Sequence, residues 1–138
     1  MHQMNPDMQA CMDACHECHV TCLHMAMNHC LEMGGQHAAP EHIKIMLDCA
    51  RICEVAIDFM ARKSSHHQHI CRECAEVCRA CAASCESLDG MEDCVAACRK
   101  CADACEKMAA PMLSRFRVRW PTWQQSRARA RARARSRR

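Results

Sequence analysis

Cysteine is the residue of this chain whose number and spacing point to chemistry. Sixteen of the 138 residues are cysteine, and most of them stand three or four residues apart in runs. Steps of three and four keep side chains on one stripe of an α-helix, at positions where a helical bundle ordinarily carries leucine or isoleucine. A core lined by thiols predicts a protein that holds metal ions. The runs are Cys11, Cys15, Cys18 and Cys22; Cys49 and Cys53; Cys71, Cys74, Cys78, Cys81 and Cys85; and Cys94, Cys98, Cys101 and Cys105.

Pairs of cysteines four residues apart suit a soft, two-coordinate ion. Residues at i and i+4 of a helix have Cβ atoms about 5–6 Å apart. With metal–sulfur bonds of about 2.3 Å, one ion lying nearly between two sulfurs joins such a pair. Thiolate and thioether ligands together select Cu(I). One Cu(I) per thiolate also leaves a neutral core, whereas each tetrathiolate zinc site keeps a double negative charge in a buried place. The pairs are Cys11/Cys15, Cys18/Cys22, Cys49/Cys53, Cys74/Cys78, Cys81/Cys85, Cys94/Cys98 and Cys101/Cys105.

Other interpretations of the cysteines stay open beside copper. Zinc storage or a general, metallothionein-like sequestration of heavy metals is the main alternative. A thiol redox protein or an iron–sulfur protein is less favoured, because iron–sulfur ligands follow a loop spacing and a redox enzyme needs one distinctive cysteine of low pKa. Disulfides are disfavoured because the pairs lie on single helices and the chain is expected in a reducing compartment. Cysteines that serve only as small hydrophobic core residues are the last alternative.

The composition limits how much stability a hydrophobic core supplies. Half of the residues are hydrophobic, but Cys, Met and Ala make up most of them, and the chain has two Phe and no Tyr. Bound metal is therefore expected to add stability. No stretch approaches the roughly 18 apolar residues of a membrane span. Residues 1–10 lack the basic and apolar regions of an export signal, so we expect a cytoplasmic protein that contacts no membrane.

Helix period and chain breaks predict an all-α, antiparallel, up-down-up-down four-helix bundle. Gly34-Gly35, the polar residues 63–65 and Asp89-Gly90 separate the helices, and Pro111 follows the last one. Because the linkers are short, successive helices become antiparallel neighbours. We expect a metal-storage domain at residues 1–110 and a tail at 111–138. The predicted helices span residues 5–32, 40–62, 66–87 and 91–109.

The charge separates this tail from the bundle. All 16 acidic residues precede Pro111, and the ten basic residues between Arg115 and Arg138 are all arginine. A run such as RARARARARSRR repels itself, so the tail is predicted to be disordered. The tail either contacts nucleic acid or the acidic bundle, or it is solvated and has no function. No residue of the segment distinguishes these interpretations.

The cysteine stripes resemble those of the bacterial four-helix-bundle copper storage proteins, and specifically their cytosolic branch. The stretches CMDACHECHVTC, CRECAEVCRACAASC and CVAACRKCADAC carry the resemblance, which spans residues 4–109. It implies a homotetramer of bundles without enzymatic activity. It also implies that each chain holds several Cu(I) ions on the cysteines of the stripes, for copper sequestration and homeostasis. A copper chaperone as the delivery partner is left open.

At one end of the bundle, thioether and imidazole side chains, which bind copper more weakly than thiolate, continue the cysteine stripes. Where the first helix ends and the second begins, the stripes continue as Met25, His29, His42 and Met46. The resemblance implies that metal enters at this end, past methionine or histidine, so these four residues are candidate ligands on the way in. Cys30 falls off its stripe at the same end and is a further candidate ligand.

Overall fold

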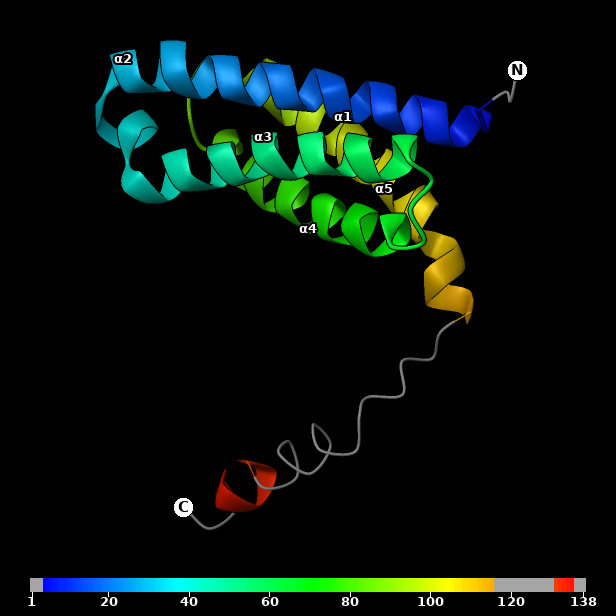
Figure 1. The fold of residues 1–138 in the computed structure, drawn as a ribbon. Helices are drawn as coiled ribbons and strands as arrows, with labels where there is room; N and C mark the ends of the chain where they lie inside the picture. The colour runs from blue at the N-terminus through cyan, green and yellow to red at the C-terminus, as the bar shows by residue number, and fades with distance from the viewer. Residues whose placement is uncertain (1–3, 116–130, 136–138) are drawn as a thin grey trace.

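Four long helices form the protein, in a computed structural model that describes residues 4–115 and 131–135. They are α1 (Pro6–Met25), α3 (Pro40–Ala61), α4 (His67–Glu86) and α5 (Glu92–Arg115). Figure 1 shows them side by side, with α1 packed against α3 and α5, and α4 packed against the same two helices. Each helix thus has two neighbours around a shared axis. The predicted all-α, up-down-up-down bundle is confirmed.

Local sequence signals fix where the helices begin. Asn5 caps α1, because its side-chain oxygen accepts a hydrogen bond of 2.8 Å from the backbone N–H of Asp7. Pro6 and Pro40 stand in the first turns of α1 and α3, where a missing backbone N–H costs nothing. Gly90 turns the chain between α4 and α5 with a φ of 79°, which glycine adopts without strain.

The first predicted helix is not one regular helix. After α1 the chain forms a π-helical turn, η1 (Ala26–Cys30), and then the short α2 (Leu31–Met33). A 3₁₀ turn, η2 (Gly35–Ala38), leads into α3. Gly34-Gly35 ends the helical run as predicted, and both glycines have positive φ. The π turn and the 3₁₀ turn were not predicted.

The C-terminal part differs from the prediction in two places. Helix α5 continues through Pro111 to Arg115, although the sequence predicted its end at residue 109. A proline late in a helix removes one hydrogen bond, and the preceding Lys-Met-Ala-Ala favours helix strongly enough to continue past it. Residues 131–135, expected without structure, form one helical turn with exposed side chains, in keeping with the helix propensity of Ala and Arg. The rest of the predicted disordered tail lies outside the described residues.

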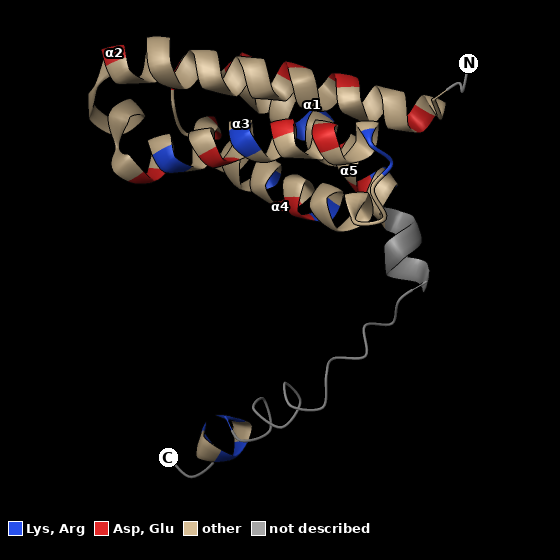
Figure 2. Ribbon diagram, viewed as in Figure 1, with Lys and Arg blue, Asp and Glu red and all other residues tan. Residues whose placement is uncertain are grey.

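Sulfur fills the centre of the bundle, and charge lies on its outside. Every cysteine is fully buried, as are Met46, Met60 and Met91. Small side chains such as Ala56 and Ala102 are also fully buried and let the helices approach closely. Figure 2 shows acidic and basic residues spread along all four long helices, and those that the structure describes have exposed side chains. Within the described residues, no helix combines the length and the apolar character needed to cross a bilayer.

Candidate metal centre

The sixteen thiols share one interior. None has exposed surface, and the structure holds all of them as free cysteines. They come from all four long helices and from η1, so the stripes predicted on separate helices meet along the bundle axis. A thiol without water around it gains little from hydrogen bonds to its neighbours, because sulfur is a weak donor and acceptor. Soft metal ions are partners that can bind the thiols of such an interior.

Sulfur–sulfur contacts run between helices as closely as within them. Along one helix, Cys18 and Cys22 lie 3.8 Å apart. Across helices, the sulfurs of Cys22 and Cys98 lie 3.5 Å apart, and Cys18 lies 3.6 Å from Cys49. The prediction treated pairs on one helix as the unit of metal binding. The structure instead joins most of these pairs across helices, and the Cys81/Cys85 pair contacts the sulfur of Met46.

Several groups of cysteines bring their sulfurs within 4.8 Å of one another, and the groups overlap. Cys18, Cys49, Cys53, Cys74, Cys78, Cys101 and Cys105 each belong to two groups. A shared thiolate has to bridge two ions when both groups are filled. The groups are Cys15/Cys74/Cys101/Cys105, Cys18/Cys49/Cys53/Cys78, Cys18/Cys22/Cys49/Cys98, Cys53/Cys74/Cys78/Cys101 and Cys11/Cys71/Cys105.

The sulfur–sulfur distances indicate which coordination number a bound ion can have with the least movement of the cysteines. An ion in the centre of three thiolates, with bonds of about 2.3 Å, sets the sulfurs about 4.0 Å apart, and a linear pair needs about 4.6 Å. The pair Cys101/Cys105 is 4.0 Å apart and Cys74/Cys78 is 3.8 Å apart. Three-coordinate sites therefore need almost no adjustment, and linear sites need a change of about 0.6–0.8 Å.

Close contacts among the thiols lower the pKa of some of them and raise the pKa of others. Hydrogen bonds from Cys105 and Cys15 lower the pKa of Cys101 to about 7. Contact with Cys22 is the main influence that lowers the pKa of Cys81 to about 6. In the opposite direction, Cys18 and Cys49 raise the pKa of Cys22. Neighbouring thiols thus favour the thiolate form at some positions of the network and the protonated form at others, and a soft cation binds thiolate.

Cys30 lies in the core although its sequence position is off the stripe. In a regular α-helix, each step of four residues drifts about 40° around the axis. The π turn η1 holds one residue more per turn and removes this drift, so Cys22, Ala26 and Cys30 are all buried. Burial raises the pKa of the Cys30 thiol. No feature of the sequence alone predicts this π turn.

Cys30 has an imidazole and a thioether beside it. Its sulfur lies 3.4 Å from Nε2 of His42 and 3.6 Å from Sδ of Met91. Nδ1 of His42 contacts Oγ of Ser84 at 2.7 Å, which fixes the ring and leaves Nε2 toward the sulfur. Burial, and then the nearby His37, lower the pKa of His42, so its ring is neutral and has a lone pair for a metal. Cys30 and His42 were predicted as ligands, whereas Met91 was expected at this end of the bundle only and was not among the candidate ligands.

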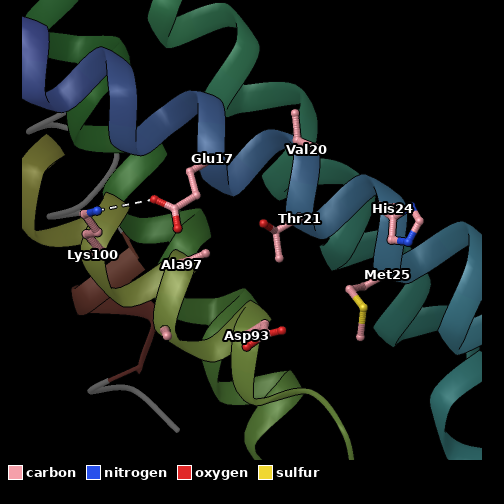
Figure 3. Close-up of a pocket in the computed structure, with 9 residues that line it drawn as sticks. Glu17, Val20, Thr21, His24, Met25, Asp93, Ala97 and Lys100 are labelled. Carbon is pink, nitrogen blue, oxygen red and sulfur yellow. Dashed lines mark hydrogen bonds and ion pairs between the residues drawn. The ribbon is translucent and has the colours of Figure 1, made fainter.

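The four candidate ligands at this end do not form one cluster. Met46 is fully buried, and its sulfur lies 3.5 Å from Cys81 and 3.4 Å from Cys85. Met25 instead lines a groove between α1 and α5, and Figure 3 shows its side chain there beside Thr21 and Asp93. His29 is half-buried, and its Nε2 is buried without a hydrogen-bond partner. Of the predicted four, His42 and Met46 contact core cysteines directly.

His29 and His37 close the end of the bundle. Their rings meet edge to face with centroids 5.4 Å apart. Nε2 of His37 lies 2.8 Å from the backbone oxygen of Asp89, and Nε2 of His29 faces Gly90. His37 therefore ties η2 to the turn between α4 and α5. His37 was not among the predicted site residues, because its contact spans 52 residues of the chain and no local pattern reveals it.

Known proteins resemble this chain in sequence and in fold. The sequence profile of the family described as copper storage protein matches residues 4–110. The structure of the Nmul_A1745 protein from Nitrosospira multiformis has 54% sequence identity and a TM-score of 0.75, over 76% of this chain and 96% of that chain. The Cu(I)-bound copper storage protein BsCsp3 has 35% identity and a TM-score of 0.69, over 75% of this chain and 98% of that chain. The uncharacterized cysteine-rich protein YhjQ of Bacillus subtilis (strain 168) is 36% identical over 81 residues, which are 59% of this chain and 74% of YhjQ.

Proposed function

Because the chain belongs to the copper storage protein family, we propose that it stores many Cu(I) ions in the thiol core of its bundle. In this role it acts in the cytoplasm as a non-enzymatic reservoir that sequesters copper and keeps its concentration in balance. The sixteen cysteines are the proposed ligands. His42 and Met46, together with Met25 and His29 at the same end of the bundle, are proposed as weaker ligands than the thiolates.

The main support for this proposal is that the buried groups of thiols overlap. Seven cysteines belong to two groups each, so a full core requires bridging thiolates. Monovalent copper fits this arrangement because one Cu(I) per thiolate neutralises the interior, and burial makes uncompensated charge costly. The binding of Cu(I) by BsCsp3, a relative with the same fold, supports the same metal.

Zinc is the second candidate, because four thiols within 4.8 Å of one another also describe a tetrahedral zinc site. Two of the groups, Cys15/Cys74/Cys101/Cys105 and Cys18/Cys22/Cys49/Cys98, share no residue. Zinc filling these two groups leaves a double negative charge at each, and the buried residues that the structure describes include no lysine or arginine to offset it. Zinc therefore fills few sites, and copper fills many.

An anaerobic titration separates these functions. The reduced protein is titrated with Cu(I) in the presence of a competing chelator, and copper and protein are quantified together. Copper storage predicts saturation near one ion per thiol, and zinc added in excess leaves the bound copper in place. Saturation at two or three ions, or displacement of copper by zinc, contradicts the proposal. A visible iron–sulfide absorption in protein isolated without added copper favours the electron-carrier alternative.

We also propose that four chains assemble into a homotetramer, as the family resemblance implies. Exposed apolar side chains along α1, η1, α2 and α3 support an interface there, because such residues in one region mark protein contacts. A mass of four chains in analytical ultracentrifugation is the expected result, and a monomer at micromolar concentration opposes it. Delivery of the ion by a copper chaperone belongs to the same proposal. The exposed side chains are Val20, Leu23, Met27, Leu31, Met33 and Leu47.

A further inference from the structure

A second groove, between α4 and α5, reaches the sulfur core from the side. It has a volume of about 360 Å³ and lies beside the Asp89-Gly90 turn. Leu88 and Val95 form part of its walls, and the ion pair between Glu86 of α4 and Arg99 of α5 joins its two sides. Two buried sulfur residues, Cys85 and Met91, also line it. The groove therefore ends at sulfur ligands.

From this groove a continuous chain of sulfur atoms leads inward. Sγ of Cys85 lies 3.4 Å from Sδ of Met46, and Sδ of Met46 lies 3.5 Å from Sγ of Cys81. Cys81 is a fully buried thiol of the core, as is Cys22. Cys22 belongs to a group of four thiols in the core. An ion at Cys85 thus reaches Cys81, a buried core thiol, in two short steps between neighbouring soft ligands.

The other approaches at this end offer no such chain. The groove between α1 and α5 contains one sulfur residue, Met25, among the residues that line it, and no cysteine (Figure 3). The axial end is packed with side chains, since His37 bonds to Asp89 and the Nε2 atom of His29 is buried facing Gly90. The family resemblance implied an entrance at this end of the bundle and left open on which face it lies.

We propose that Cu(I) reaches the core sideways, between α4 and α5, and that Cys85 is the first thiol to take it and Met46 the next ligand. This inference rests on the proposed copper storage. The step is a ligand exchange in which copper stays monovalent. A Cu–S bond to Cys85 forms as the bond to a donor ligand breaks, the thiol proton of Cys85 goes to solvent, and the released donor keeps its electron pair.

The ion pair Glu86–Arg99 controls how readily the groove opens. Both side chains are about half exposed, and exposed pairs contribute little to stability, so thermal motion separates them easily. Arg99→Gln removes the pair and leaves the carboxylates of Glu86 and Glu92, which attract a cation to the groove. This variant is expected to load copper faster, by no more than about fivefold, because an exposed pair holds the helices only weakly.

Two matched substitutions test the route by filling one groove or the other. Val95→Trp fills the groove between α4 and α5, and Val20→Trp adds the same bulk to the groove that contains Met25. The full-length reduced protein is mixed with the coloured Cu(I)–bicinchoninic acid complex, and the loss of colour gives the loading rate and, at the end, the capacity. Val95→Trp is expected to load roughly tenfold more slowly with normal final capacity, since blocked access lowers an association rate. Val20→Trp is expected to keep the rate of the unchanged protein.

A second pair of variants keeps the test decisive if tryptophan disturbs the packing of α4 against α5. Cys85→Ser and Cys71→Ser each remove one thiol from α4, near its end and its start respectively. The second variant measures what the loss of any one thiol does to the rate. Cys85→Ser is expected to load several-fold more slowly than Cys71→Ser, with the same small loss of capacity.

The outcomes separate the route from the storage function. Slower loading in Val20→Trp alone overturns the route in favour of the groove at Met25. Equal rates for both tryptophan variants, together with equal rates for both serine variants, also overturn it, and then copper enters along the axis. If the unchanged protein binds few copper ions at saturation, the proposed storage function itself fails. Normal capacity combined with the predicted order of rates supports both.

Discussion

Replacement of Cys74 and Cys78 by alanine tests whether the thiols bind copper as separable ligands or as one cooperative cluster. The two sulfurs are 3.8 Å apart, and each lies 3.7 Å from the sulfur of Cys53. The double change touches three of the overlapping thiol groups, but it removes only two of the sixteen thiols. If thiolates can bridge and the remaining sulfurs rearrange, we expect capacity to fall by about one eighth, in proportion to the ligands lost.

The same variant costs stability without destroying the fold. Both side chains are fully buried, and removal of one sulfur atom from a packed core costs about 1 kcal/mol at each site. For a domain of this size, a total of about 2 kcal/mol lowers the melting temperature of the metal-free protein by about 8 °C. Circular dichroism should show unchanged helix content below that temperature.

The assay is an anaerobic Cu(I) titration of the variant beside the unchanged protein, with a thermal melt of each metal-free form. Val77→Ala is the matched control, because Val77 packs against the core from the same helix and carries no metal ligand. This control should lose stability and keep its full copper capacity. Loss of more than half of the capacity in Cys74→Ala/Cys78→Ala, with the fold intact, refutes the reasoning and shows a single cooperative cluster.

Three further predictions follow from the structure. The reduced, metal-free protein should be helical by circular dichroism and should melt at a higher temperature with Cu(I), because only the folded state gathers the thiols; a random-coil spectrum argues against a preformed core. Burial raises the pKa of Cys30 above the ordinary value of 9.0, so its stabilising contribution is complete below about pH 9 and is lost as pH rises further. The difference in unfolding free energy between the unchanged protein and Cys30→Ala should therefore shrink above that pH in anaerobic urea titrations, and a growing difference contradicts the burial of a neutral thiol. Gly90→Ala should lower the melting temperature more than Gly34→Ala: both positions have positive φ, but only at Gly90 does an added Cβ meet His29, 3.2 Å from Nε2. Equal losses in the two variants exclude a tight contact at His29.

The sequence predicted the bundle and most of its core because the cysteines repeat at the period of the helix. Cys11, Cys53 and Cys98 point inward for the same reason that leucines would, and all are fully buried. The chain breaks at Gly34-Gly35 and Asp89-Gly90 are local signals, and the helices end close to them. The helical period and the helix-breaking residues are properties of single segments, so one sequence suffices to predict them.

Features that depend on contacts between segments could not be predicted in this way. The π turn that brings Cys30 inward depends on how η1 packs, and no residue type specifies it. The contact between Cys22 and Cys98 depends on the register of α1 against α5, which the spacing within either helix leaves free. For the same reason, the sequence placed Met25 and Met46 together, whereas one lines a surface groove and the other lies in the core.

The position of copper in a loaded crystal tests the central claim most directly. Crystals of the reduced protein grown with Cu(I) give anomalous scattering at the copper absorption edge, which marks each ion independently of the surrounding atoms. We predict a row of copper peaks along the bundle axis, bonded at about 2.3 Å to the cysteine sulfurs that the structure brings together. Copper confined to exposed histidines such as His66 and His69, with the thiol core empty, contradicts the account.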